Sequence, residues 1–155
     1  TSTSSRPDSA AAATAGSASG RDDTAHRHVL TRMQRHLASA RGSGGGPAHA
    51  FVTELSSAYA QINIQGPRSR EVLSAVTTVD MSNDAFPFRH AREIDIAYSR
   101  VLSVRITYLG ELGYELYVPA EAAVGVWERL LSVGEPWGLP HAGLKALSSL
   151  RMEKG

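Results

Sequence analysis

The stretch from Val104 to Pro119, VRITYLGELGYELYVP, constrains the fold of this chain more than any other. Two segments of alternating apolar and polar residues, Arg100–Leu109 and Tyr114–Val118, lie on either side of a glycine-containing turn. Alternation with a period of two is typical of β-strands, and Gly110 and Gly113 supply the positive φ that a short hairpin turn requires. The pattern therefore predicts a β-hairpin. One face of its first arm carries the side chains of Leu102, Val104, Ile106 and Tyr108.

Polar side chains gather around this turn. Two phenols, Tyr108 and Tyr114, and two carboxylates, Glu111 and Glu115, lie within eight residues of one another. Such a group indicates a polar pocket beside the turn. The spacing leaves a second interpretation open, a plain surface hairpin, because loops are rich in polar residues by default.

The hairpin sequence resembles the signature hairpin of the aminomethyltransferase (glycine cleavage T-protein) folate-binding family. It is most similar to the version fused to FAD-dependent sarcosine and dimethylglycine dehydrogenases. Three further stretches match that family in the same order: NIQGPRS at Asn63–Ser69, DMSNDAFPF at Asp80–Phe88, and the segment Ala142–Gly155, which ends in SLRMEKG. The resemblance covers roughly Ala50 to Gly155, about two-thirds of the chain.

The resemblance implies a tetrahydrofolate site with two principal residues. Glu115 takes the place of the pterin-binding glutamate, where a carboxylate accepts two N–H groups from the pterin edge, and Tyr108 takes the place of a pterin-contacting tyrosine. Glu111 and Arg151 are possible supporting residues. We interpret Glu111 as a turn residue bonded to backbone N–H groups, and Arg151 as a partner of Glu111 or Glu153. The alternative for Glu115 and Tyr108 is pairing with basic neighbours on the sheet.

The resemblance also implies a reaction. A separate domain holding FAD oxidises an N-methyl group of sarcosine or dimethylglycine to an iminium, and the folate domain captures the one-carbon unit as 5,10-methylenetetrahydrofolate. The resemblance further implies that the protein lies in the mitochondrial matrix in a eukaryote or in the cytoplasm in a bacterium. The family's catalytic aspartate lies in a region that residues 1–50 do not match, so no catalytic residue is assigned and the fragment alone is expected to be inactive.

Two other functions stay open. One is a non-catalytic regulatory relative, similar to the regulatory subunit of pyruvate dehydrogenase phosphatase. The other is the glycine cleavage aminomethyltransferase itself, which is disfavoured because Leu147 stands where the simple aminomethyltransferases carry an arginine.

Charge and composition limit the classes of partner and cofactor that this chain is expected to bind. The formal net charge of +1 provides no electrostatic case for a nucleic acid or an anionic membrane, and no apolar run approaches 18 residues. Cysteine is absent, which excludes disulfides, thiolate catalysis and zinc–cysteine sites. No metal is expected, because His26, His28 and His36 lack a completing ligand and three consecutive side chains at Ser82–Asp84 favour a turn.

The N-terminal part differs from the rest in composition. Of the first 20 residues, 17 are Ser, Thr, Ala or Gly, so residues 1–22 are predicted to be a flexible linker or insertion. A transit peptide is the alternative. Residues 23–155 are predicted to be a partial folate-binding domain, truncated at both ends, with a loop insertion at 42–49. An amphipathic helix is expected over Ala25–Ala40.

The rest of the chain is predicted to contain both strands and helices. Strands are predicted at Phe51–Leu55, Tyr59–Gln65 and Arg92–Ala97, in addition to the hairpin, with the first two in the same sheet as the hairpin. Helices are predicted from Gly66 to about Val76, from Pro119 to near Gly134 and over about Gly143–Glu153. Phe86 and Phe88 are expected to pin the loop at 80–89 to the core. The mixture indicates an α+β fold, and the resemblance implies a ferredoxin-like mixed or antiparallel sheet with helices packed on it.

Overall fold

Five strands and four α-helices make up the part of the chain that the computed structural model describes, which is residues 12–15, 20–42 and 44–154. The strands are β1 (Ala12–Ala15), β2 (Tyr59–Gln65), β3 (Ala91–Ile96), β4 (Ser99–Val104) and β5 (Gly113–Pro119). The helices are α1 (Gly20–Ser39), α2 (Ser69–Ser74), α3 (Ala123–Gly134) and α4 (Leu144–Lys154). Short 3-10 turns occupy Ser56–Ala58, Ala120–Ala122 and Glu135–Trp137.

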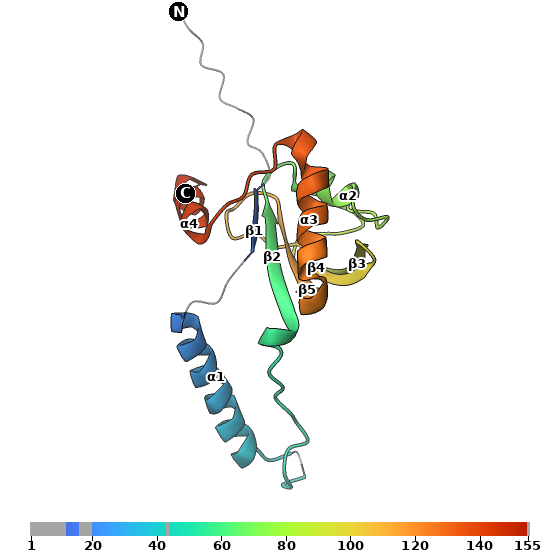
Figure 1. Cartoon of the computed structure of the whole chain (residues 1–155). Coiled ribbons are helices and arrows are strands. Elements are labelled where there is room, and N and C mark those ends of the chain that lie inside the picture. Colours follow the sequence, from blue (N-terminus) through green and yellow to red (C-terminus); the bar gives the residue numbers. More distant parts are fainter. Residues whose placement is uncertain (1–11, 16–19, 43, 155) are drawn as a thin grey trace, which may run out of the picture. The chain divides into compact units, whose positions relative to one another are not determined.

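The strands form one antiparallel sheet in the order β1-β2-β5-β4-β3 (Figure 1). With helices on the sheet, this confirms the α+β class. The ferredoxin-like arrangement is wrong, however, because that motif places a second helix between its last two strands. Here β4 and β5 are joined by the loop 105–112, and the next helix follows β5.

The chain divides into two compact units. One contains the described parts of residues 1–16 and 57–155, including all five strands, and the other contains the described part of residues 17–56, including α1. Because β2 and β5 pair along their whole lengths, from Tyr59 opposite Pro119 to Gln65 opposite Gly113, these two strands are the centre of the first unit.

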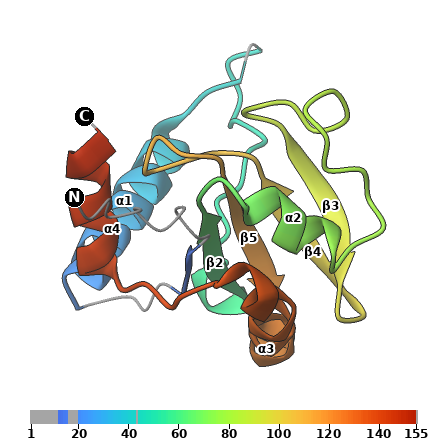
Figure 2. The same ribbon diagram turned by 90° about the horizontal axis from the view of Figure 1, so that it is seen from above.

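The core lies on one face of the sheet. Alternate residues of the two central strands, Ile62, Ile64, Leu116 and Val118, are buried there. Helices α2 and α3 cover this face and contact β5 and each other (Figure 2). They contribute the buried side chains of Val72, Leu73, Val126 and Leu130. Burial of apolar surface at this face is the main source of stability for the unit.

Several predicted bounds agree with the structure. The strand β2 has the predicted limits, and β3 and α2 to α4 lie at or within a few residues of the predicted elements. The periods of these segments are unambiguous, because each buries one face only. The loop at 80–89 is pinned to the core by Phe86 and Met81, whereas Phe88 is 51% exposed and stacks on the guanidinium of Arg89.

Other elements differ from the prediction. Residues 51–55 form no strand, and Phe51 is 81% exposed without a neighbouring strand to pair with among the described residues. Conversely, Ala12–Ala15, inside the predicted linker, pair with Ile62–Gln65 as β1. The linker's residues 1–11 and 16–19 lie outside the described residues, and Gly20–Asp22 begin α1.

The helix α1 has the amphipathic pattern that the sequence predicts, although it starts earlier, at Gly20. Val29 and Met33 are about half exposed. Two hollows of about 610 and 520 Å³ border this helix, and neither is lined by a carboxylate. None of the helices in the described part is long and apolar enough to cross a membrane.

Candidate functional site

The second face of the sheet is polar at its centre. Period-two alternation turns Gln61 and Asn63 of β2 and Glu115 and Tyr117 of β5 away from the core. Asn63 lies opposite Glu115, and Gln61 lies opposite Tyr117. One strand pair therefore carries apolar residues on one face for stability and hydrogen-bonding groups on the other.

The predicted apolar row of β4 lies on this polar side rather than in the core. Leu102 is opposite Tyr117 and is 41% exposed, whereas Val101 and Ser103 are fully buried. The strand also ends at Val104, five residues earlier than the alternation suggests. Beyond it, the backbone of Arg105 still bonds to Arg89 and His90, just before β3, and its guanidinium donates a hydrogen bond to the carbonyl of Phe86.

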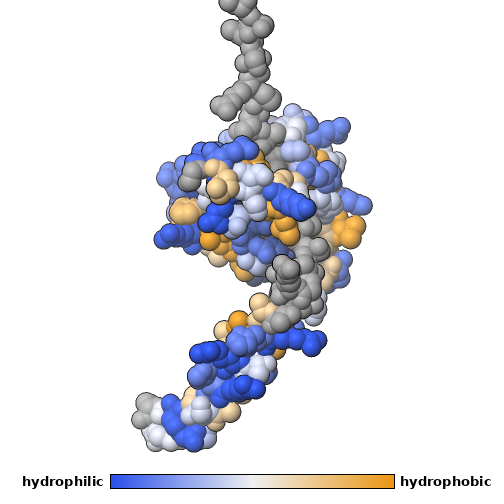
Figure 3. All heavy atoms as spheres, turned by 90° about the vertical axis from the view of Figure 1, so that its left-hand side faces the viewer, coloured by the Kyte–Doolittle hydropathy of each residue, from blue (hydrophilic) through white to orange (hydrophobic). Residues whose placement is uncertain are grey.

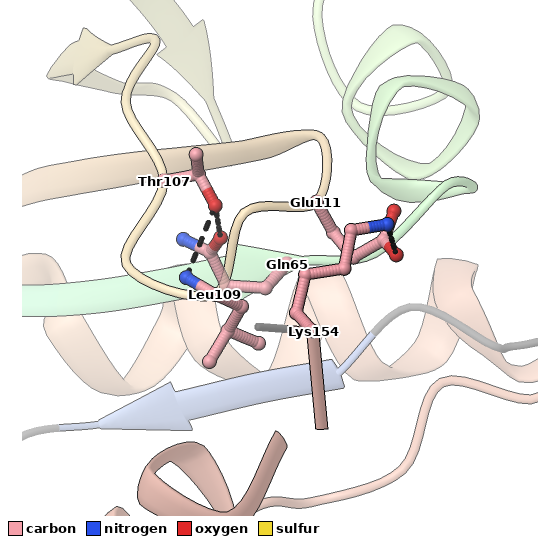
Figure 4. A network of polar contacts seen from close by, with 5 residues as sticks. All are labelled: Gln65, Thr107, Leu109, Glu111 and Lys154. Atoms are coloured by element: carbon pink, nitrogen blue, oxygen red, sulfur yellow. Dashed lines mark hydrogen bonds and ion pairs between the residues drawn. The ribbon is translucent and has the colours of Figure 1, made fainter. Parts of the chain in front are cut away.

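The connection between β4 and β5 is an eight-residue loop, 105–112, rather than a tight turn. Thr107 holds it to β2: its hydroxyl donates to Oε1 of Gln65 at 3.1 Å and accepts the backbone N–H of Leu109 at 3.2 Å (Figure 4). At its far end, the carbonyl of Leu112 accepts the N–H of Gly66 at 2.7 Å. These contacts fix the loop beside the polar face.

Gly110 in the loop and Gly113 at the start of β5 serve different purposes. Gly110 has φ +78°, the left-handed conformation that the sequence predicts. Gly113 lacks a positive φ, and instead the carboxamide of Gln65 lies against it, in the space that a Cβ would occupy. Gly113 is therefore required by close packing.

This packing predicts that Gly113→Ala lowers the free energy of unfolding by about 1–3 kcal/mol, because the methyl group must displace Gln65 and break its bond to Thr107. The matched control is Gly125→Ala in α3, where a Cβ would meet no atom within 4 Å. There, alanine's helix propensity should raise stability by up to about 1 kcal/mol. Urea unfolding measures the free energy of unfolding of both variants, and equal changes would contradict the requirement for glycine at position 113.

The helix α4 contacts the loop through two cationic side chains. Lys154 Nζ lies 2.7 Å from Oε1 of Glu111, and the guanidinium carbon of Arg151 lies 4.4 Å from the ring centroid of Tyr108. Glu111 is thus an ion-pair partner of Lys154 rather than a residue bonded to backbone N–H groups. Likewise, Arg151 stacks on Tyr108 instead of pairing with Glu111 or Glu153. Both contacts are partly exposed, so each contributes about 1 kcal/mol or less.

A hollow of about 270 Å³ lies between the polar face and α4. Its lining brings together the two residues singled out in the sequence, Tyr108 and Glu115. The other lining residues are Gln61, Asn63, Gln65, Leu144, Leu147 and Ser148. Glu111 and Arg151 do not line it and contribute only through their contacts with Lys154 and Tyr108. The amides of β2 and the apolar residues of α4 are the part of the site that sequence analysis missed, although the alternation of Gln61, Asn63 and Gln65 was a signal for the amides.

The carboxylate of Glu115 is half buried and held from one side. The phenol of Tyr117 donates a hydrogen bond to Oε2 of Glu115 at 2.9 Å. Burial raises the pKa of the Tyr117 phenol, and the hydrogen bond to Glu115 and its negative charge raise that pKa further. The pair therefore presents a carboxylate and a protonated phenol side by side at the edge of the hollow.

The hollow can hold a flat polar ring. A carboxylate accepts hydrogen bonds, carboxamides both donate and accept, and a tyrosine ring offers an aromatic surface. Leu144 and Leu147 supply an apolar wall. Among the described residues, no group of three or more His, Cys, Asp or Glu side chains is placed to hold a metal ion.

The model of the GCVT N-terminal domain matches residues 20–155 of this chain. The chain belongs to the GCV_T family. This confirms the resemblance that the hairpin and the three accompanying motifs indicate. In this GCV_T domain, the matched region contains the whole of the hollow and both units' described helices.

The curated relatives of this GCV_T domain are much longer proteins, and the chain matches only a part of each. The chain is 44% identical over 106 residues to 4-methylaminobutanoate oxidase (formaldehyde-forming) of Paenarthrobacter nicotinovorans, covering 68% of the chain and 13% of that protein. It is 40% identical over 104 residues to mitochondrial sarcosine dehydrogenase of Homo sapiens, covering 67% of the chain and 11% of that protein. The chain thus spans about a tenth of the length of these relatives.

A solved structure supports the fold. The heterotetrameric sarcosine oxidase from Corynebacterium sp. U-96, in complex with pyrrole 2-carboxylate, superimposes with a TM-score of 0.54 over 64% of this chain and 50% of the matched chain. The sequence identity is 17%, so the likeness shows that the GCV_T domain shares an architecture with that structure.

Proposed function

We propose that this domain binds the pterin ring of tetrahydrofolate in the hollow between the polar sheet face and α4. The observation that carries the proposal is that Tyr108, in the loop 105–112, and Glu115, on β5, line one cavity. Glu115 accepts the N–H groups of the pterin edge, and Tyr108 packs against the ring.

The size and lining of the hollow fit this ligand in part. Pockets for whole drug-sized molecules measure roughly 300–1,000 Å³, so about 270 Å³ suits a ring rather than a complete tetrahydrofolate. The remainder of the ligand would extend beyond the hollow. The amides of Gln61 and Asn63 offer donors and acceptors to the pterin edge on the side opposite to the leucine wall.

In the whole protein, we propose that the bound folate accepts a one-carbon unit from the iminium of an N-methylglycine. An FAD-containing domain outside this chain supplies the oxidation, and the product is 5,10-methylenetetrahydrofolate. Holding the acceptor next to the source of the iminium raises the effective concentration of the acceptor and limits release of formaldehyde. This chain's residues bind and orient the folate, and no proton-transferring residue is assigned.

Calorimetric titration of the protein that contains this domain with tetrahydrofolate, under anaerobic conditions, tests the proposal. We expect one site per domain with a dissociation constant in the micromolar range. The same protein with Tyr108→Ala and Glu115→Ala together serves as the site-deleted control. Absence of binding by the wild type would reject folate as the ligand and favour the non-catalytic regulatory function, and equal binding by the control would reject this hollow as the folate site.

A further inference from the structure

Tyr117 lies next to the site but is not one of the residues lining the hollow. It is two residues from Glu115 on the same face of β5, and its phenol contacts Oε2 of Glu115 at 2.9 Å. We propose that Tyr117 is a positioning residue, which holds the Glu115 carboxylate in the orientation that accepts the pterin N–H groups. This inference rests on the proposed function.

The chemistry of the contact assigns the direction of the hydrogen bond. An ionised carboxylate has no proton, so the phenol is the donor. Each carboxylate oxygen can accept two hydrogen bonds, and Tyr117 occupies one position on Oε2. Oε1 and the second position on Oε2 stay available for two N–H groups of a ligand. The contact therefore orients Glu115 without using its capacity for a bidentate pair.

Neighbouring strands confine the same pair from both sides. Asn63 of β2 and Val104 of β4 lie opposite Glu115, while Gln61 and Leu102 lie opposite Tyr117. Side chains in such pairs have Cβ atoms roughly 4.5–5.5 Å apart, which leaves little room for lateral rotamers. Because a glutamate that is already held loses less rotamer freedom on binding, the arrangement preorganises the site.

The phenol also stays a donor across the working pH range. Its pKa lies above the ordinary tyrosine value, because burial and the Glu115 carboxylate both disfavour the phenolate. Titratable groups that line the hollow on the other elements are limited to Tyr108. At neutral pH, therefore, the contact combines a protonated phenol with a carboxylate.

Titration of tetrahydrofolate against the whole protein tests the inference. Tyr117→Phe keeps the ring and removes the donor, so we expect binding weaker by about 2- to 10-fold, the cost of immobilising one glutamate side chain. The matched control is Tyr98→Phe, since Tyr98 is fully exposed in the β3–β4 turn and should not change affinity. In a Glu115→Ala background, Tyr117→Phe should have no further effect. An equal loss in both backgrounds would show that the Tyr117 hydroxyl acts independently of Glu115, and would overturn the inference.

A second readout needs no ligand. Absorbance of ionising tyrosines, compared between wild type and Tyr117→Phe, isolates the titration of Tyr117. In Glu115→Ala its pKa should fall towards the ordinary value, and an unchanged midpoint would overturn the contact. Wild-type protein that fails to bind tetrahydrofolate would overturn the proposed function and this inference with it. Wild-type binding that Tyr117→Phe leaves intact would overturn the inference alone.

Discussion

Glu115→Gln is expected to weaken tetrahydrofolate binding by roughly 30-fold to several hundred-fold, which corresponds to the 2–4 kcal/mol of a charge-assisted bidentate pair. The amide removes the negative charge and turns an N–H group towards the N–H edge of the pterin. Calorimetric titration of the protein that contains this domain measures the change. Oxidation of the amine should be almost unaffected, because that chemistry is proposed for a different domain.

Two glutamates serve as matched controls for that experiment. Glu93→Gln lies on β3 of the same sheet, where the carboxylate pairs with Arg100 in solvent, and should leave affinity unchanged. Glu111→Gln breaks the ion pair with Lys154 and should have only a small effect, because Glu111 does not line the hollow. Equal, small effects of Glu115→Gln and Glu111→Gln would reject Glu115 as the pterin anchor.

Phe86→Ala is expected to lower the free energy of unfolding by about 3–5 kcal/mol, the usual cost of removing a buried phenylalanine. Phe86 is fully buried, and its ring centroid lies 5.7 Å from that of Tyr114 in the core. The loss of this ring leaves a cavity and removes an apolar contact between the loop at 80–89 and the core, whereas the backbone carbonyl that accepts the hydrogen bond from Arg105 is kept.

Phe88→Ala, two residues away, is the matched control. Its ring is half exposed and contacts only the Arg89 guanidinium among the aromatic and cationic pairs of the described residues, so the expected loss is below about 1 kcal/mol. Urea unfolding followed by circular dichroism compares the two variants. Similar losses would mean that both phenylalanines pin the loop, which is the prediction from sequence that the structure contradicts.

The parts of the fold that sequence predicts well are those with one buried face. In β2 the alternation of Ile62 and Ile64 with Gln61 and Asn63 sets both the element and its limits. The helix α3 is similar, since Val126 and Leu130 recur one turn apart and are fully buried. Periodicity reports burial, so it succeeds where one side of an element packs and the other does not.

Sequence patterns fail where pairing partners decide the structure. Residues 51–55 have suitable side chains for a strand but no neighbouring strand within the described part of the chain, whereas the alanines of β1 carry no pattern and still pair with β2. Alternation continues from Val104 to Tyr108, yet the strand ends at Val104, and the loop that follows is held by Thr107 through its hydrogen bond to Gln65. Hydrogen-bond partners distant in the sequence determine these cases.

The candidate site shows the same division. The hairpin motif places Tyr108 and Glu115 close together, and the hollow contains both. The apolar wall from α4 could not be predicted, because Leu144 and Leu147 are separated from the hairpin by α3 and a turn. The hydrogen bond between Glu115 and Tyr117 could have been predicted from the sequence, since residues two apart in a strand share a face.

The division of the two central strands into an apolar and a polar face has a consequence for engineering. Odd-numbered positions 61, 63, 115 and 117 contact the hollow or its carboxylate, while even-numbered positions 62, 64, 114 and 116 are packed in the core. A library randomised at the odd positions alone would sample new ligands on an intact scaffold. The same library moved by one residue along either strand would yield mainly unfolded protein, so ligand preference and foldability can be selected separately in this domain.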